Sequence, residues 1–369
     1  MDYQARLDGL KKRLKQQGID VLALLPGANL TYLTGIRKKV SERPLVFFLS
    51  PLHSARPVVL LPHLEVETFS RALPYEVNLI PYTDEEGYAN AFAEAANALR
   101  LGGKTIGMEA SSMRLLELRQ IQRNATGSKI VEVDAILSQG RMRKDRDEIE
   151  AIRRAIKVSE ESLRATCAQV RPGMSERDVQ MLLNMEMLKH GADGHGFPPI
   201  VLSGPRAALP HGSASDRCLQ EGDCLLIDFG FRVGAYSADI TRTFSIGTAN
   251  PEWKEIYDVV KASNEAGRKA AGPGVTAEEV DAAARKVIVD AGYGKYFTHR
   301  TGHGLGLEIH EPPYIVSGNK TVLEPGMVFT VEPGIYLANK VGVRIEDDIV
   351  ITKDGAESLS TLPRELTSL

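Results

Sequence analysis

Cysteines are few in this chain of 369 residues. There are three, Cys167, Cys218 and Cys224, and no two of them have the C-x-x-C spacing of a redox or zinc motif. An odd count without that spacing argues against a disulfide framework and against a structural zinc site built from thiolates. We expect reduced thiols with structural roles.

Long apolar runs and an excess of one charge are also missing. No run approaches the roughly 18 apolar residues that span a bilayer, and the N-terminus lacks the basic start and apolar core of a secretion signal. The 45 Lys and Arg nearly balance 48 Asp and Glu, for a formal net charge of -3. We therefore expect a cytoplasmic protein that binds neither nucleic acid nor membrane.

The composition that remains, 43% hydrophobic and 25% charged, is ordinary for a soluble globular enzyme, and the length allows two domains. The first part alternates helix and strand patterns, with helices over about 3–17, after Pro26-Gly27 and over 90–100, and strands at 21–25, 45–49 and 57–61. This alternation predicts an α/β domain over residues 1–139. A charged helix from 141 to about 170 is predicted to open a second domain, residues 140–369.

The second domain contains an internal repeat. Two segments, 172–191 and 273–292, begin with Pro-Gly, continue into a predicted helix with a capping pair and end in glycine. Each segment is followed by a strand with the frame Gly-x5-acid-x-Gly, in which the acid is Asp228 or Glu332. Two similar helix-and-hairpin halves are the simplest explanation.

Four acidic residues form two pairs on the predicted hairpins. Folding the first hairpin about Val233-Gly234 places Asp228 across from Asp239, and folding the second about Asn339 places Glu332 across from Glu346. Carboxylates directly opposite each other repel, and Asp228 follows an apolar run, so a positive species is expected between them. A pair of divalent cations would meet that need.

His303 adds an imidazole to this acidic set. It lies in a segment, 301–312, whose alternation of small and large residues is typical of a strand beside crowded backbone. His303 and His310 need not share a strand face, so one can bind metal while the other faces substrate. Four carboxylates and one imidazole disfavour structural zinc and suit Mn, Co, Fe or catalytic Zn. Two such metals can hydrolyse an amide.

These residues resemble the pita-bread metallopeptidase family. The matching motifs are Asp228-Phe-Gly, Ser237-Ala-Asp239-Ile-Thr241-Arg-Thr, the segment 302–312, Val331-Glu332-Pro-Gly and Val343-Arg344-Ile-Glu346-Asp. The segment 29–35 is similar to the domain that precedes the catalytic domain in creatinase, prolidase and aminopeptidase P. The resemblance implies an α+β fold: a pita-bread catalytic domain with an internal pseudo-two-fold repeat, preceded by a smaller creatinase-type α/β domain.

The resemblance also implies a role for each matching residue. Two divalent ions per subunit, Mn first and Co, Zn or Fe as alternatives, would be held by Asp228, Asp239, His303, Glu332 and Glu346. Asp239 and Glu346 would bridge the ions, and Glu332 would also accept the proton of the attacking water. His211 and His310 would contact the substrate and stabilise the tetrahedral intermediate, while Arg344 and Thr241 would orient the ligands.

Three further residues bear on the substrate pocket. Phe197 and Tyr236 are candidates for its wall, with core packing as the alternative for both. Prolidases often carry an Arg just after their His-Glu-x-Pro segment, where this chain has Tyr314. A dipeptidase has to recognise a free carboxylate, so a cation is expected in its pocket.

The resemblance implies removal of the residue before a proline at the second position of a peptide. The missing Arg at position 314 favours an aminopeptidase for longer peptides, whereas the chain length, and the option that another Arg or a His substitutes, favour a dipeptidase. A non-hydrolytic or metal-free relative, such as a creatinase-like enzyme or a binding module, is opposed by the five intact ligands. By resemblance the chain is expected to form a homo-oligomer, most often a dimer.

Overall fold

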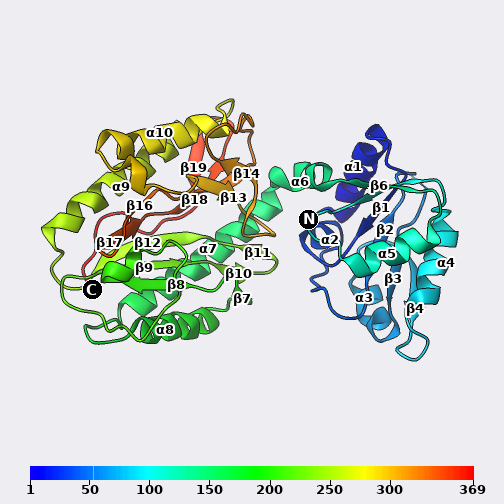
Figure 1. The fold of residues 1–369 in the computed structure, drawn as a ribbon, viewed down its shortest axis with the longest axis horizontal. Helices are drawn as coiled ribbons and strands as arrows, with labels where there is room; N and C mark the ends of the chain where they lie inside the picture. The colour runs from blue at the N-terminus through cyan, green and yellow to red at the C-terminus, as the bar shows by residue number, and fades with distance from the viewer. Residues whose placement is uncertain (53) are drawn as a thin grey trace. The chain divides into compact units, whose positions relative to one another are not determined.

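The computed structural model describes residues 1–52 and 54–369, which divide into two compact units, Met1–Arg141 and Met142–Leu369 (Figure 1). Within the described residues, no helix has both the length and the apolar composition needed to cross a membrane.

The first unit is an α/β domain. Its described residues form a sheet in the order β4-β3-β2-β1-β5-β6, in which β2 is antiparallel to both neighbours and the other neighbouring pairs are parallel. The strands are β1 (Val21–Leu24), β2 (Val46–Leu49), β3 (Val58–Pro62), β4 (Asn78–Tyr82), β5 (Thr105–Met108) and β6 (Lys129–Glu132). The helices are α1 (Tyr3–Gln16), α2 (Ala28–Thr34), α3 (Val66–Ala72), α4 (Ala89–Leu99), α5 (Leu115–Asn124) and α6 (Asp134–Met142).

Helices cover both faces of this sheet. Val21 and Ala23 point into a core with α4 and α5, whereas Leu22 and Leu24 point into a second core with α1 and α2. Because neighbouring side chains of a strand face opposite sides, a strand covered on both faces is apolar throughout, which is why 21–25 has no polar alternation. The helices and strands predicted in this part of the sequence are confirmed.

The second unit, all of whose residues are described, contains four α-helices and short antiparallel sheets. The helices are α7 (Arg146–Cys167), α8 (Glu176–Lys189), α9 (Pro251–Ala270) and α10 (Ala277–Asp290). The first half holds β7 (Gly194–His195), β8 (Ile200–Ser203), β9 (Cys224–Phe229), β10 (Phe231–Val233), β11 (Tyr236–Ser237) and β12 (Ile240–Ser245). The second half holds β13 (Gly302–Gly304), β14 (Glu311–Ile315), β15 (Val328–Val331), β16 (Gly334–Leu337), β17 (Val341–Arg344), β18 (Asp347–Ile351) and β19 (Ala356–Ser358).

The prediction of one helix from 141 to about 170 was wrong at its start. Helix α6 ends at Met142 and α7 begins at Arg146. Asp145 separates them because its carboxylate accepts a hydrogen bond from the backbone N–H of Glu148, whose own carboxylate accepts one from the N–H of Asp145. This capping box makes the charged run a helix boundary.

The predicted internal repeat is present in the backbone of the second unit. Helices α8 and α10 both begin with the predicted capping boxes, Ser175 with Asp178 and Thr276 with Glu279. Ahead of the two helices, the N–H of Gly173 donates to the carbonyl of Leu219, and the N–H of Gly274 donates to the carbonyl of Leu323, both at 2.9 Å. The same local fold therefore occurs twice.

Candidate metal centre

The first hairpin places Asp228 opposite Thr241, so the predicted pairing of Asp228 with Asp239 was wrong. The turn lies at Gly234-Ala235, between the paired residues Val233 and Tyr236, and Gly234 has a φ of 66°. A turn centred one residue later shifts the register by two residues. Because side chains alternate with a period of two, Asp239 still faces the same side as Asp228.

The second hairpin has the predicted register. Val331 pairs with Asp347 and Gly334 pairs with Arg344, so Glu332 and Glu346 stand opposite each other between these two ladders. Asn339, at the predicted turn, has a φ of 59°, a left-handed conformation that asparagine tolerates better than most residues.

The five predicted ligands converge. Potential ligand atoms lie within 4.8 Å of one another in three groups: Asp228, Asp239 and Glu346; His303, Glu332 and Glu346; and Asp239, His303 and His310. The Nε2 atom of His303 is 3.3 Å from Oε1 of Glu332 and 3.5 Å from Oδ2 of Asp239. Asp239, His303 and Glu346 each belong to two groups, but only Asp239 and Glu346 share one group with Asp228 and another with His303, so these two lie between Asp228 and His303.

The electrostatics of this cluster call for a cation. Burial, followed by the neighbouring carboxylates, raises the pKa of Asp239 and of Glu346 well above the ordinary range, and burial raises the pKa of Glu332 to about 7. Burial also lowers the pKa of His303, which favours the neutral imidazole that binds metal. Oδ1 of Asp228 is buried with no hydrogen bond to any described residue. The residues therefore fit a divalent metal centre.

Arg344 connects ligands from both hairpins. Its Nη2 donates to Oδ2 of Asp228 at 2.5 Å, and its Nε donates to the hydroxyl of Thr241 at 3.2 Å. That hydroxyl donates in turn to Oε2 of Glu346 at 2.6 Å. The Nη1 atom donates to the hydroxyl of Tyr336, which also hydrogen-bonds to Nε2 of His299. His299 and Tyr336 were not predicted from the sequence, because their contact joins segments 37 residues apart.

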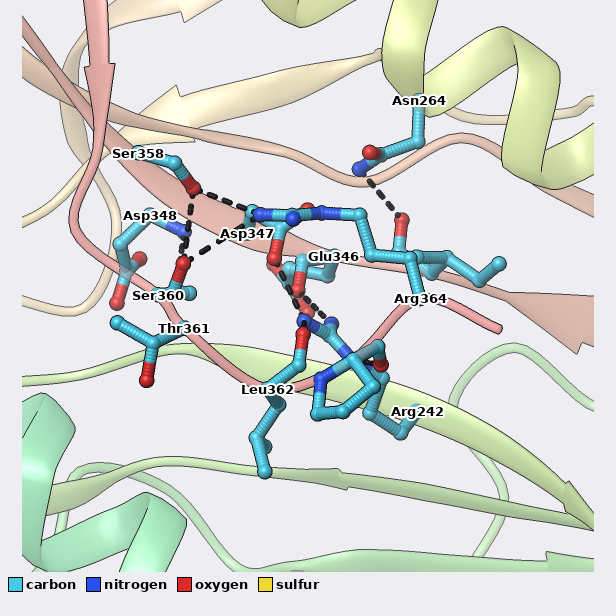
Figure 2. A network of polar contacts seen from close by, with 12 residues as sticks. Arg242, Asn264, Glu346, Asp347, Asp348, Ser358, Ser360, Thr361, Leu362 and Arg364 are labelled. Carbon is cyan, nitrogen blue, oxygen red and sulfur yellow. Dashed lines mark hydrogen bonds and ion pairs between the residues drawn. The ribbon is translucent and has the colours of Figure 1, made fainter. Parts of the chain in front are cut away.

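A polar network holds the strand behind Glu346 (Figure 2). Arg242 donates to the backbone carbonyl of Glu346 at 2.6 Å and to Oδ1 of Asp347 at 2.7 Å. Arg364 donates to the other oxygen of Asp347. The amide of Asn264, on α9, donates to the carbonyls of Val331 and Ile345, the residues just before Glu332 and Glu346. The second acidic pair is thus fixed through its backbone.

The cluster opens into a cavity of about 600 Å³. The lining includes all five predicted ligands together with His211, His310, Phe197, His299, Arg300 and Arg344. The ring of His310 packs against that of His303, with 4.0 Å between centroids. His211, His310 and Phe197 therefore face the same space as the metal cluster.

Two predicted pocket residues lie elsewhere. Tyr236 is not among the described residues that line the cavity: it is buried in the hydrophobic core, and its hydroxyl donates to Glu148 at 2.8 Å. The cavity lining does not include Tyr314 either, but the guanidinium of Arg300, which is part of the lining, lies 4.6 Å from the centroid of its ring. Tyr314 therefore contacts the cavity-lining residue Arg300 without lining the cavity itself.

Comparison with known proteins covers nearly the whole chain. Residues 150–353 match the model of metallopeptidase family M24, and residues 6–143 match the creatinase/prolidase N-terminal domain. The putative dipeptidase YkvY of Bacillus subtilis is 34% identical over 99% of both chains, and the Xaa-Pro dipeptidase of Pyrococcus horikoshii is 34% identical over 96% of both.

Solved structures agree with this comparison. The prolidase from Thermococcus sibiricus aligns over 100% of both chains with a TM-score of 0.94 and 33% identity. The X-Pro aminopeptidase from Thermotoga maritima aligns over 98% of both chains with a TM-score of 0.86 and 36% identity. The predicted pita-bread architecture behind a creatinase-type domain is confirmed, and the chain belongs to metallopeptidase family M24.

Proposed function

We propose that this chain is a metal-dependent peptidase that hydrolyses the bond between an N-terminal residue and a following proline. The observation that carries the proposal is the convergence of four carboxylates and His303 on one cavity in a member of a metallopeptidase family. Relatives described as Xaa-Pro dipeptidase and X-Pro aminopeptidase support the preference for proline.

The five ligands would hold two divalent cations, with Asp239 and Glu346 shared between them. Asp239 and Glu346 each belong to one ligand group with Asp228 and to another with His303, which supports this sharing. The oxygen-rich donor set suits manganese, with Co, Zn or Fe as alternatives. When bound, such ions act as Lewis acids toward the scissile carbonyl and the attacking water.

Residues in and around the cluster would transfer the proton and stabilise the tetrahedral intermediate. Glu332 would accept the proton of the attacking water as general base. Burial, with a further contribution from Arg300, lowers the pKa of His310, so its imidazole is neutral near pH 7 and can donate one N–H to a carbonyl oxygen. His211 enters the same cavity from another loop, and the two histidines would hold the oxygen of the tetrahedral intermediate.

Arg300 favours dipeptides as the second candidate substrate class. The guanidinium of Arg344 donates hydrogen bonds to Asp228, Thr241 and Tyr336. The guanidinium of Arg300, by contrast, makes no hydrogen bond to any residue in the described part of the chain and stacks only on the ring of Tyr314. A guanidinium free to pair is suited to the carboxylate of an Xaa-Pro dipeptide. The cation missing at position 314 would then come from position 300.

Manganese as the natural metal, a homodimer and a cytoplasmic location are also proposed, on the resemblance to the family. The experiment that tests the function compares an Xaa-Pro dipeptide with an Xaa-Pro-Yaa tripeptide at saturating manganese, alongside metal analysis of the purified protein. We expect cleavage of Xaa-Pro bonds, about two ions per chain, and loss of activity with a chelator. Chelator-insensitive activity of metal-free protein would contradict the proposal.

A further inference from the structure

Glu176, the first residue of α8, is a carboxylate with 0% exposure outside the metal cluster. Its Oε1 accepts hydrogen bonds from the backbone N–H and the hydroxyl of Ser203, at 2.7 and 3.0 Å. Its Oε2 accepts from Nε of Arg206 at 3.0 Å, and from the N–H and hydroxyl of Ser215 at 2.9 and 2.7 Å. The proposed reaction has no use for this group.

The residues that donate to Glu176 lie at the two ends of one loop and inside it. Ser203 is the last residue of β8, and Ser215 follows the loop 204–214, whose first part is a short 3-10 helix, η2 (Gly204–Ala208). Arg206 lies inside the loop and also donates through Nη2 to the backbone carbonyl of Ser213 at 2.7 Å. A single buried carboxylate therefore ties the two ends of the loop together and, through Arg206, fixes its second half.

His211 is carried by this loop. It lines the cavity, it is exposed, and its ring makes no hydrogen bond with any residue that the structure describes. His310, by contrast, packs its ring against His303. The position of the His211 ring thus depends on the backbone of its loop. The inner side of the loop has little room, because a Cβ on Gly212 would lie 2.9 Å from a methyl carbon of Leu202.

We propose that Glu176 is a positioning residue for His211: it acts on the reaction only by fixing the loop that holds this histidine in the cavity. The proposal rests on the proposed function, because it takes His211 as a group that contacts the substrate. A displacement of about 1 Å at a substrate-contacting group can reduce the rate by on the order of 100-fold.

A double-mutant cycle in the metal-loaded full chain tests this role. Glu176→Gln keeps the shape of the side chain but replaces one acceptor oxygen with an amide NH₂, which cannot accept from these donors. We expect it to reduce kcat/KM for an Xaa-Pro peptide by on the order of 100-fold with unchanged metal content. In a His211→Ala background it should cause no further loss. Equal losses in both backgrounds would overturn the proposal, because they would show that Glu176 acts independently of His211.

Two further variants separate positioning from stability. Ser175→Ala removes the N-cap of the same helix, where the serine hydroxyl accepts from the N–H of Asp178, and leaves the loop contacts intact. It should lower Tm without lowering kcat/KM. Arg206→Gln removes the guanidinium that donates to Glu176 and to Ser213, and it leaves the carboxylate of Glu176 with its serine donors. It should cause a smaller kinetic loss that also disappears in the His211→Ala background. If Glu176→Gln does not fold, the same double-mutant cycle is measured with Arg206→Gln in its place.

Hydrogen–deuterium exchange gives a readout that does not require activity. In Glu176→Gln we expect faster exchange in peptides covering 204–214 and unchanged exchange in β9 and β15. If the wild-type chain cleaves no Xaa-Pro peptide, the proposed function fails, and this comparison still decides whether Glu176 holds the loop. Unchanged exchange in 204–214 would overturn the proposal.

Discussion

The hydroxyl of Thr241 donates a 2.6 Å hydrogen bond to Oε2 of Glu346, and both side chains are buried. The same hydroxyl accepts from Arg344, which also donates to Asp228. One threonine thus connects a ligand of the second hairpin to a ligand of the first.

Replacing Thr241 with Val should weaken metal binding. The substitution keeps the side-chain shape and leaves an oxygen of Glu346 without its donor, and losses of such outer partners commonly reduce metal affinity by about 10–100-fold. A competition titration with a chromophoric chelator measures the change. Thr166→Val is the matched control, because that buried hydroxyl donates to the carbonyl of Ser162 on α7. Equal affinities in the two variants would contradict the link.

Glu332→Ala should abolish turnover and leave the fold intact. The variant removes both a ligand and the proposed general base, and general-base catalysis alone contributes roughly 10²–10⁴-fold to rates. Circular dichroism checks the fold, and a sensitive peptide-cleavage assay checks the activity. Appreciable remaining turnover in folded protein would count against the role of Glu332.

Metal affinity should rise with pH. The pKa of Glu332 is raised by burial from an ordinary 4.5 to about 7, so below about pH 7 a proton competes with the metal. Because the raised pKa means that the folded metal-free chain binds more protons than the unfolded chain, its stability should fall as pH increases from about 4.5 to 7. Thermal unfolding with and without manganese measures this; a pH-independent affinity between 5 and 8 would contradict the expectation.

Arg300→Met should selectively impair dipeptide hydrolysis. A hydrogen bond to a charged partner contributes about 1.5–3 kcal/mol, so we expect KM for an Xaa-Pro dipeptide to rise roughly 10–100-fold. The matching Xaa-Pro amide, which lacks the carboxylate, is the control substrate and should be unaffected. An equal rise in KM for both substrates would show that Arg300 does not bind the carboxylate of the dipeptide.

Tyr236→Phe should affect stability and not catalysis. The tyrosine lies in the core and donates to Glu148, so losing its hydroxyl should lower the free energy of unfolding by about 1 kcal/mol. Phe197→Ala, in the cavity wall, is the comparison that should change KM. A change in kcat or KM of Tyr236→Phe without a change in stability would contradict the core role and support a role of Tyr236 in the pocket.

Local patterns predicted α1, α2, α4, α8 and α10, the capping boxes of α8 and α10, and the second hairpin, because each depends on residues close in sequence; the break between α6 and α7 was not predicted. Asn339 marked its turn correctly, whereas the Val233-Gly234 signal was centred one residue early, and that error alone changed the partner of Asp228. His299, Arg300 and Glu176 could not be predicted in the same way. Their roles depend on partners that the fold brings from elsewhere, such as Tyr336 for His299.

The two halves of the second unit share the local fold at the start of α8 and α10 but differ in chemistry. Each half supplies acidic residues from its hairpin, yet the imidazole ligand and both cavity arginines come from the second half alone. Substrate preference in such a chain can evolve through loop residues such as His211 and Arg300 while the shared scaffold stays unchanged.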